Sequence, residues 1–409
     1  MKLVIINHSD SLGGASVVSY RLLKALRARG VDASMLVCHK ASSDPTVHTA
    51  APAWRCKIPF LAEHLRIFAG NGFNRADLFK ASIATDGLPL SRHPLIREAD
   101  AVLLNWVNQG MLSLSEIGRI AAERPVIWTM HDMWNLTGVC HHAGECARYK
   151  GPGFCHDCHL LHGRAGAHDL SYVTSERKAR LYSKAHIHFV AVSRWLRELA
   201  EQSVLMAGQE LSVIPNAFPL DDFYCDARGI ALPFDIPDNK KIILMGAARL
   251  DDPVKGLGYA IEALNGLERD DAVAVFFGAL RNPAALDGLR FPHVHTGPVS
   301  DPEVLRELYA RASVVMSTSL YETLPGTLVE GQAAGCVPVS FDRGGQPDII
   351  DDGVSGYLVP AYDTAAFTRA LDRALDGTIA PATLRSSVES RFSADAVASR
   401  YIDLISNMK

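Results

Sequence analysis

The chain has 409 residues, of which 48% are hydrophobic and 21% charged, and its formal net charge is −4. This length exceeds what one hydrophobic core usually organises, so we expect two domains of about 150–200 residues each. The slightly acidic balance excludes a global attraction to nucleic acid. The sequence contains no run of about 20 apolar residues, so we predict no membrane-spanning helix. The N-terminal apolar run is too short for a signal peptide, so we expect a cytoplasmic protein.

Strands and helices are predicted to alternate along the first half of the chain. A strand over residues 2–7, a helix over 15–29 and a strand over 34–38 form a unit that implies a parallel sheet. Further strands are predicted at 101–104, 126–130, 187–192 and 211–214, with helices at 112–123 and 174–184. These strands are continuously apolar, which indicates a sheet buried on both faces.

The alternation stops over residues 216–238, where prolines and acidic residues follow without a period, and we interpret this segment as a linker. Strands then resume at 241–246, 272–277, 313–317 and 337–340. We therefore predict the α/β class, with two doubly wound, Rossmann-like parallel-sheet domains facing a cleft. The predicted domains are residues 1–215 and 239–390, and a last helix in 391–409 crosses back to the first.

Residues 54–73 mix large apolar side chains with arginine and lysine. One interpretation is a basic amphipathic surface in peripheral contact with the inner face of the cytoplasmic membrane. The other is a helix packed on the first domain near an acceptor pocket. The sequence leaves both open.

The strongest chemical signal is the segment 317–339, STSLYETLPGTLVEGQAAGCVPV. A strand ends, a loop carries Glu322, and a helix begins near Gly326. Because helix N-termini expose unpaired N–H groups, the amides of Gly326, Thr327 and Leu328 can bind a pyrophosphate. Glu322 is placed to hold sugar hydroxyls and Glu330 a ribose. Taken alone, each carboxylate could equally be a solvated acid.

Three other strand ends carry candidate ligand groups. Arg249 and Lys255 lie six positions apart after the strand at 241–246, and such cations can converge on a diphosphate. His131 follows the strand at 126–130, at the strand end where ligands bind in such sheets. Gly13 and Gly14 follow the first strand and let the backbone approach a ligand. The absence of a G-x-G-x-x-G pattern argues against a nicotinamide enzyme.

Together these segments resemble glycosyltransferase family 4, the large group of retaining GT-B enzymes. The match rests on Glu322, on Glu330 eight positions later, and on the helix end A-A-G-C-V-P-V. The loop T-L-P-G departs from the family's usual loop rich in Gly and Phe. The resemblance implies the GT-B fold, a UDP- or GDP-linked sugar donor, and no cofactor required for catalysis.

The resemblance also implies residue roles. The implied catalytic residues are His131, Arg249, Lys255 and Glu322. The implied donor-binding residues are Gly13, Gly14, Pro298, Val299, Gly326, Thr327, Leu328 and Glu330. Pro298 and Val299 would lie near the nucleotide base, whereas Asp301 is expected to cap a helix.

The implied reaction is retaining sugar transfer to a growing, lipid-linked cell-surface polysaccharide or another glycan or glycolipid. Within the family, the Cys-rich insertion at residues 140–158, after the H-D-x-W motif, resembles the exopolysaccharide subgroup that includes colanic acid and amylovoran enzymes. Two alternatives stay open. One is an epimerase or phosphorylase on the same fold, and the other is a non-catalytic scaffold that binds sugar nucleotides.

A cysteine cluster follows His131. Cys140, Cys146, Cys155 and Cys158 fall within 19 residues, with the spacing C-x5-C-x8-C-x2-C. In a reducing compartment such a cluster favours a metal over disulfides, and four thiolates can complete a tetrahedral zinc shell. Structural zinc is the preferred interpretation, with free thiols and disulfides as alternatives.

Overall fold

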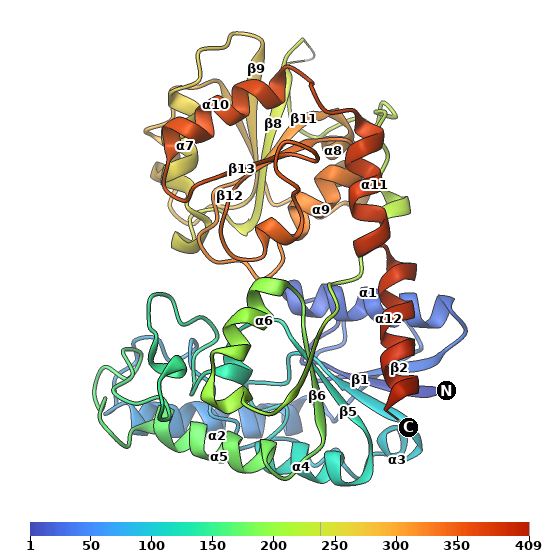
Figure 1. Ribbon diagram of the computed structural model, residues 1–409, viewed down its shortest axis with the longest axis vertical. Coiled ribbons are helices and arrows are strands. Elements are labelled where there is room, and N and C mark those ends of the chain that lie inside the picture. Colours follow the sequence, from blue (N-terminus) through green and yellow to red (C-terminus); the bar gives the residue numbers. More distant parts are fainter. Residues whose placement is uncertain (238, 409) are drawn as a thin grey trace. The chain divides into compact units, whose positions relative to one another are not determined.

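The computed structural model describes residues 1–237 and 239–408, which divide into two compact units (Figure 1). Unit 1 comprises Met1–Ala217 and the residues from Val397 on, and unit 2 comprises Phe218–Ala396. Two predicted segments end outside the described residues: the linker at Asp238 and the last helix at Lys409. No helix in the described part of the chain is both long and apolar enough to cross a bilayer.

Unit 1 is built on a parallel sheet, which has seven strands within the described residues, in the order β3-β2-β1-β4-β5-β6-β7. The strands are β1 (Lys2–Ile6), β2 (Asp32–Val37), β3 (Val47–Thr49), β4 (Ala101–Leu104), β5 (Val126–Met130), β6 (Ile187–Ala191) and β7 (Glu210–Val213). Every residue of β4 and β5 is buried, as expected for strands covered on both faces.

Helices cover both faces of this sheet. They are α1 (Gly14–Ala28), α2 (Ala53–Gly70), α3 (Pro94–Glu98), α4 (Leu114–Glu123), α5 (Leu170–Tyr182), α6 (Arg194–Glu201) and α12 (Ala394–Asn407). Figure 1 shows α2, α4 and α5 together on one face, with α1 and α12 on the other. The hydroxyl of Tyr401 in α12 is hydrogen-bonded to that of Thr129 in β5 (2.9 Å), which ties the end of the chain to unit 1.

Unit 2 has a second parallel sheet, with six strands among the described residues, in the order β10-β9-β8-β11-β12-β13. The strands are β8 (Lys241–Arg249), β9 (Ala272–Ala279), β10 (His293–Gly297), β11 (Ala312–Ser317), β12 (Val337–Phe341) and β13 (Tyr357–Val359). The helices are α7 (Leu257–Asn265), α8 (Pro302–Arg311), α9 (Gly326–Ala333), α10 (Thr364–Leu375) and α11 (Pro381–Phe392).

The two strand orders confirm the predicted α/β class and show where ligands should bind. Each sheet winds in opposite directions from one pair of neighbouring strands, β1 and β4 in unit 1 and β8 and β11 in unit 2. In open parallel sheets, ligands bind outside the carboxyl ends of the strands at this reversal. The positions of the predicted site residues can therefore be compared with these two reversal points.

Candidate functional site

In unit 2, the loop after β11 is joined to the turn after β8. The Leu320 N–H donates to the Val254 carbonyl (2.8 Å), and the Thr318 hydroxyl donates to the carbonyls of Lys255 (3.1 Å) and Gly256 (3.0 Å). Gly256 has a φ of 67°, and a Cβ there would lie 2.2 Å from the Thr318 oxygen. Only glycine fits this approach, so the two segments form one surface at the reversal point.

Both predicted cations lie on this surface, each beside a carboxylate. Arg249 ends β8, and its guanidinium lies 2.7 Å from the Asp252 carboxylate. The Lys255 ammonium forms an ion pair with Glu322, and both side chains are about three-quarters buried. The structure thus brings together Lys255 and Glu322, which the sequence separates by 67 positions.

The Glu322 loop is held in place by the segment after β12. The Gly345 N–H donates to the Glu322 carbonyl (2.8 Å), and a Cβ at Gly344, where φ is 66°, would lie 2.6 Å from that oxygen. The Arg343 guanidinium lies 4.9 Å from the centroid of the Tyr321 ring and donates to its hydroxyl (3.0 Å). The position of Glu322 is therefore fixed by backbone contacts that the motif itself does not contain.

Helix α9 begins at Gly326, directly after this loop, with Pro325 at the N-cap. The side chain of Pro325 makes no capping hydrogen bond, and the first turn carries no acidic residue. Its partial positive charge therefore faces the same region as Lys255. Glu330 is only 8% exposed, and its carboxylate accepts a hydrogen bond from the Tyr309 hydroxyl (3.3 Å), so it is not a solvated helix acid.

The remaining predicted donor residues in unit 2 follow β10. Pro298 and Val299 lie at the carboxyl edge of the same sheet, two strands away from Arg249. The Asp301 carboxylate accepts the Glu303 N–H (2.9 Å) and caps α8, which confirms the predicted N-cap.

In unit 1, His131 follows β5 and lies against the end of β4. Its Nε2 is 2.7 Å from Oδ1 of Asn105, the residue after β4. Burial lowers the pKa of His131 to about 4, although the charge of Asp132 opposes this effect. The imidazole is therefore neutral at neutral pH.

The Asp132 carboxylate orients two rings. It accepts the Trp106 indole N–H (3.0 Å) and the Trp134 backbone N–H (2.8 Å), and it lies 2.6 Å from Nδ1 of His141. Nε2 of His141 is in turn 3.0 Å from the Ser82 hydroxyl. Burial alone would raise the pKa of Asp132, but the charge and hydrogen bond of His141, with the Trp134 N–H, lower it to about 2.

These groups line a cavity of about 340 Å³, formed by Phe79, Lys80, Trp106, Asp132, His141, His142 and Leu160. Its volume lies in the range of small-ligand pockets, and its mix of aromatic walls and few polar groups is typical of them. Trp106 was not predicted, and His141 was predicted only as a possible zinc ligand in place of one Cys and not at this cavity. The position of Trp106, just after a buried strand, was a usable signal, whereas His141 reaches the site only because its carbonyl accepts the Met133 N–H (2.8 Å).

The predicted glycines lie at the carboxyl end of β1. Gly13 has a φ of 84° and precedes α1, and a Cβ at Gly13 or Gly14 would meet nothing within 4 Å in the described structure. The backbone there is open to solvent, as a ligand-approaching loop requires.

The four clustered cysteines line one small cavity of about 20 Å³. All are free thiols, and burial raises the pKa of Cys140 to about 12 and that of Cys158 to about 11. Among the described residues, no three His, Cys, Asp or Glu side chains are placed to hold a metal ion. The zinc site therefore stays a prediction.

A buried lysine, absent from the sequence predictions, fixes the loop between Asp132 and the cysteines. The Lys178 ammonium donates to the carbonyls of Trp134, Thr137 and Gly138 and lies 3.4 Å from the centroid of the Trp134 indole. Burial lowers the pKa of Lys178 to about 7. This side chain supplies the donors that the loop carbonyls would otherwise lack.

Comparison with known proteins adds to this geometry. Residues 239–377, which contain Arg249, Lys255, Glu322 and Glu330, match the family model described as glycosyl transferases group 1. A D-inositol 3-phosphate glycosyltransferase of Xylanimonas cellulosilytica is 26% identical over 428 aligned positions, covering 96% of this chain and 91% of that relative. The amylovoran biosynthesis glycosyltransferase AmsK of Erwinia amylovora is 30% identical over 166 positions, covering 36% of this chain and 40% of AmsK.

The fold is also shared with solved structures. The structure of Anabaena Alr3699/HepE in complex with UDP superposes with a TM-score of 0.62 over the full length of both chains, at 14% identity. At this identity the likeness concerns the fold alone.

Proposed function

We propose that the chain is a retaining glycosyltransferase of the GT-B type, in which residues 239–377 match the glycosyl transferases group 1. It moves a sugar from a nucleoside diphosphate sugar to a glycan acceptor. The observation that carries this proposal is the surface in unit 2 where Arg249 and Lys255 lie beside the Glu322 loop, with the start of α9 directly after it.

The proposed donor site assigns a role to each part of this surface. The diphosphate binds the amides of Gly326, Thr327 and Leu328 and the two cations. Glu322 and Glu330 accept hydrogen bonds from the hydroxyls of the transferred sugar and the ribose, and Pro298 and Val299 contact the base. The donor is either UDP- or GDP-linked, and the assay below offers both.

In the proposed reaction the acceptor hydroxyl attacks the anomeric carbon on the face that the phosphate leaves. The bond between carbon and phosphate oxygen breaks, the new glycosidic bond forms, and the departing phosphate takes the acceptor proton. Arg249, Lys255 and the α9 amides stabilise the charge that develops on the leaving group. These groups supply the positive charge, so we propose that transfer requires no cofactor.

We assign the acceptor to unit 1. The Trp106 ring offers an apolar wall to a sugar, and His141 and Asp132 offer polar groups at the same cavity. His131 and the exposed backbone at Gly13 and Gly14 act near the transferred sugar. The neutral His131 ring can hydrogen-bond a hydroxyl without adding charge. The name of the relative AmsK, an amylovoran biosynthesis glycosyltransferase, supports a polysaccharide acceptor, and we propose that this acceptor is growing and lipid-linked.

For the cysteine cluster we propose structural zinc. The four thiols surround a cavity that is large enough for about one water molecule. Their side chains would have to turn toward one another to bind the ion and lose their protons. Metal analysis of the purified chain should find about one zinc per chain. A Cys155→Ser/Cys158→Ser variant that retains full zinc content would exclude this assignment.

The test of the proposed function is transfer by the purified full chain. Radiolabelled UDP- and GDP-sugars are offered with lipid-linked acceptors, and the anomeric configuration of the product is determined by NMR. We expect retention, and loss of transfer in Arg249→Ala/Lys255→Ala. Full transfer by that variant, or an inverted product, would refute the mechanism. Turnover that depends on phosphate would instead indicate a phosphorylase, and donor binding without turnover a scaffold.

A further inference from the structure

The outward face of α2 carries a stripe of large apolar side chains exposed to solvent. They are Trp54, Ile58, Leu61 and Leu65, which are 58–66% exposed. The spacing of four, three and four residues places them on one side of the helix. The buried residues Cys56, Pro59, Glu63 and Ile67 occupy the opposite side, so the stripe points directly away from the sheet. We call these four residues the α2 stripe.

The charges around the α2 stripe are basic, although the whole chain is acidic. The exposed charged residues of α2 are Arg55, Lys57 and Arg66, and Arg66 is paired with Asp86 outside the helix (2.9 Å). The only acid of α2, Glu63, is buried, where it accepts backbone N–H groups from the segment 83–84. No carboxylate of α2 therefore reaches the surface that carries the α2 stripe.

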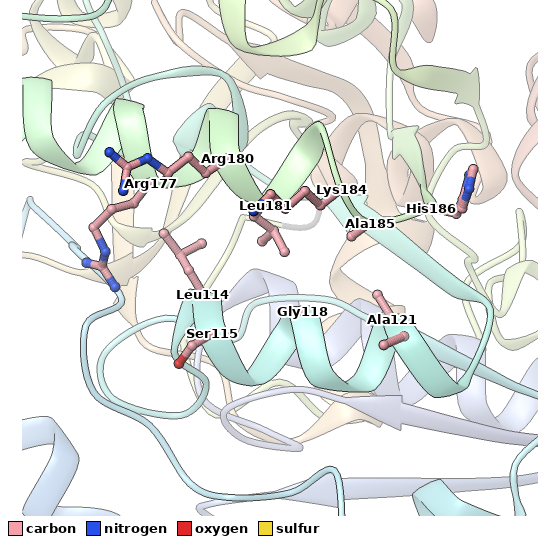
Figure 2. Close-up of a pocket in the computed structure, with 11 residues that line it drawn as sticks. Leu114, Ser115, Gly118, Ala121, Arg177, Arg180, Leu181, Lys184, Ala185 and His186 are labelled. Carbon is pink, nitrogen blue, oxygen red and sulfur yellow. The ribbon is translucent and has the colours of Figure 1, made fainter.

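A second feature lies between α4 and α5, where Figure 2 shows a groove with apolar side chains directed into it. Its volume is about 580 Å³. The apolar lining is Leu114, Gly118, Ala121, Ala122, Leu181 and Ala185, and the basic lining is Arg177, Arg180, Lys184 and His186. Within the described residues no Asp or Glu lines it. We call it the α4–α5 groove.

The two features are joined by one segment. Glu63 of α2 accepts the N–H groups of Ile83 and Ala84 (both 2.8 Å), and the Arg177 guanidinium of α5 donates to their carbonyls (3.1 and 3.3 Å). Helices α2, α4 and α5 also share one face of the unit 1 sheet (Figure 1). The α2 stripe and the α4–α5 groove therefore belong to one basic and apolar face.

We propose that this face docks on an anionic lipid bilayer. The α2 stripe enters the boundary between headgroups and acyl chains, as amphipathic interfacial helices do, while Arg55 and Lys57 stay at the phosphates. The α4–α5 groove takes one lipid, with its phosphate at the basic lining and the start of an acyl chain on the apolar lining. A second copy of the chain fits less well, because the cations Arg55, Lys57 and Lys184 of one face would oppose the same cations of the other.

Vesicle flotation of the full chain tests this docking. Vesicles of phosphatidylcholine with phosphatidylglycerol should bind the protein, and binding should weaken with salt and without the anionic lipid. Ile58→Ser/Leu61→Ser should lower the affinity roughly tenfold or more, because the apolar contribution is lost. The matched control is Val354→Ser in unit 2, an equally exposed apolar side chain that should leave binding unchanged.

The α4–α5 groove is tested separately. Ala121→Phe fills it without changing charge, and Arg180→Glu/Lys184→Glu reverses two charges of its lining. Both should reduce the preference for phosphatidylglycerol vesicles, whereas Arg290→Glu, an exposed cation of unit 2, should not. Circular dichroism melting checks that each variant is folded. Unchanged flotation of all the folded α2 and α4–α5 variants would overturn the proposal.

Two further outcomes are decisive. If light scattering shows a dimer that the α2 variant dissociates, the face is an interface between copies and the bilayer proposal fails. Transfer to a short, water-soluble acceptor should be unchanged in the docking variants, whereas transfer to a lipid-linked acceptor in vesicles should fall. Because flotation needs no turnover, a failure of the proposed transfer reaction would leave the docking result readable on its own.

Discussion

The two units both carry their candidate sites at the carboxyl ends of central strands but build them from different chemistry. In unit 2 the reversal point between β8 and β11 is lined by Arg249, Lys255 and Glu322, held by close backbone contacts. In unit 1 the residues after β4 and β5 are aromatic rings around the buried Asp132. Sheet topology thus indicates where each candidate site lies, and under the proposed function the side chains suit unit 2 to a diphosphate and unit 1 to a glycan.

Removing a cation of unit 2 should give the largest effect. Lys255→Ala and Arg249→Ala should each lower kcat/KM about 10²–10³-fold, because each removes charge that stabilises the leaving diphosphate. Steady-state kinetics with saturating acceptor measures the loss. Arg290→Ala, an exposed arginine of the same unit, serves as control. A loss confined to the acceptor KM would contradict the division of labour between the units.

Acid should weaken unit 1 through its buried histidines. Folded His131 has a pKa lowered to about 4 by burial, whereas in the unfolded chain it takes up a proton near its usual 6.5. The unfolded state therefore binds more protons between these values, and stability falls as the pH falls from about 6.5 to 4, by about 3 kcal/mol. His8, whose pKa burial also lowers to about 4, adds in the same direction.

Urea unfolding at a series of pH values measures this loss. The variant His131→Asn should flatten the pH dependence, whereas His48→Asn, an exposed histidine of the same unit, should leave it as it is. An equal slope in wild type and His131→Asn would show that the imidazole is not held neutral.

Weakening the contacts that orient the Trp106 and His141 rings should affect acceptor binding and not donor binding. Asp132→Asn weakens the hydrogen bonds to the Trp106 indole and to His141, which costs about 1–3 kcal/mol if the pocket depends on them. The acceptor KM should rise, roughly tenfold or more, with the donor dissociation constant unchanged in calorimetry. Weaker donor binding in this variant would mean that the cavity does not serve the acceptor.

The smallest expected effect concerns Glu330. Tyr309→Phe removes the hydroxyl that donates to its carboxylate and should cost about 1 kcal/mol, seen as a donor dissociation constant raised roughly fivefold. Glu330→Gln should exceed this, since it removes the proposed ribose acceptor itself. If Tyr309→Phe were the more damaging change, Glu330 would be a core residue and not a donor ligand.

Sequence patterns predicted the strands and helices, because these elements depend on residues that are close in the sequence. Continuous apolar runs identified β4 and β5 because strands buried on both faces need no alternation. Helix starts were less accurate. Helix α5 begins at Leu170, ahead of the predicted residue 174, because the Asp169 carboxylate caps it by accepting the N–H groups of Ser171 and Tyr172.

Contacts between distant segments were beyond the sequence. The motif residues Lys255 and Glu322 could be named, but their ion pair depends on β8 and β11 being neighbours and on Gly256 allowing the close approach. His141 has no motif, and it reaches Asp132 only through a loop whose carbonyls are held by the buried Lys178. Such a site is a product of packing and not of local pattern.

The ion pair of Lys255 with Glu322 bears on what leaves the protein after a reaction cycle. A ligand with both a phosphate and sugar hydroxyls offers each member of the pair a new partner. A spent nucleoside diphosphate offers a partner to the lysine alone and would leave a carboxylate that is about three-quarters buried without its cation, an arrangement that costs free energy. Under the proposed function, re-forming the pair therefore competes with the bound product and helps to release the leaving group.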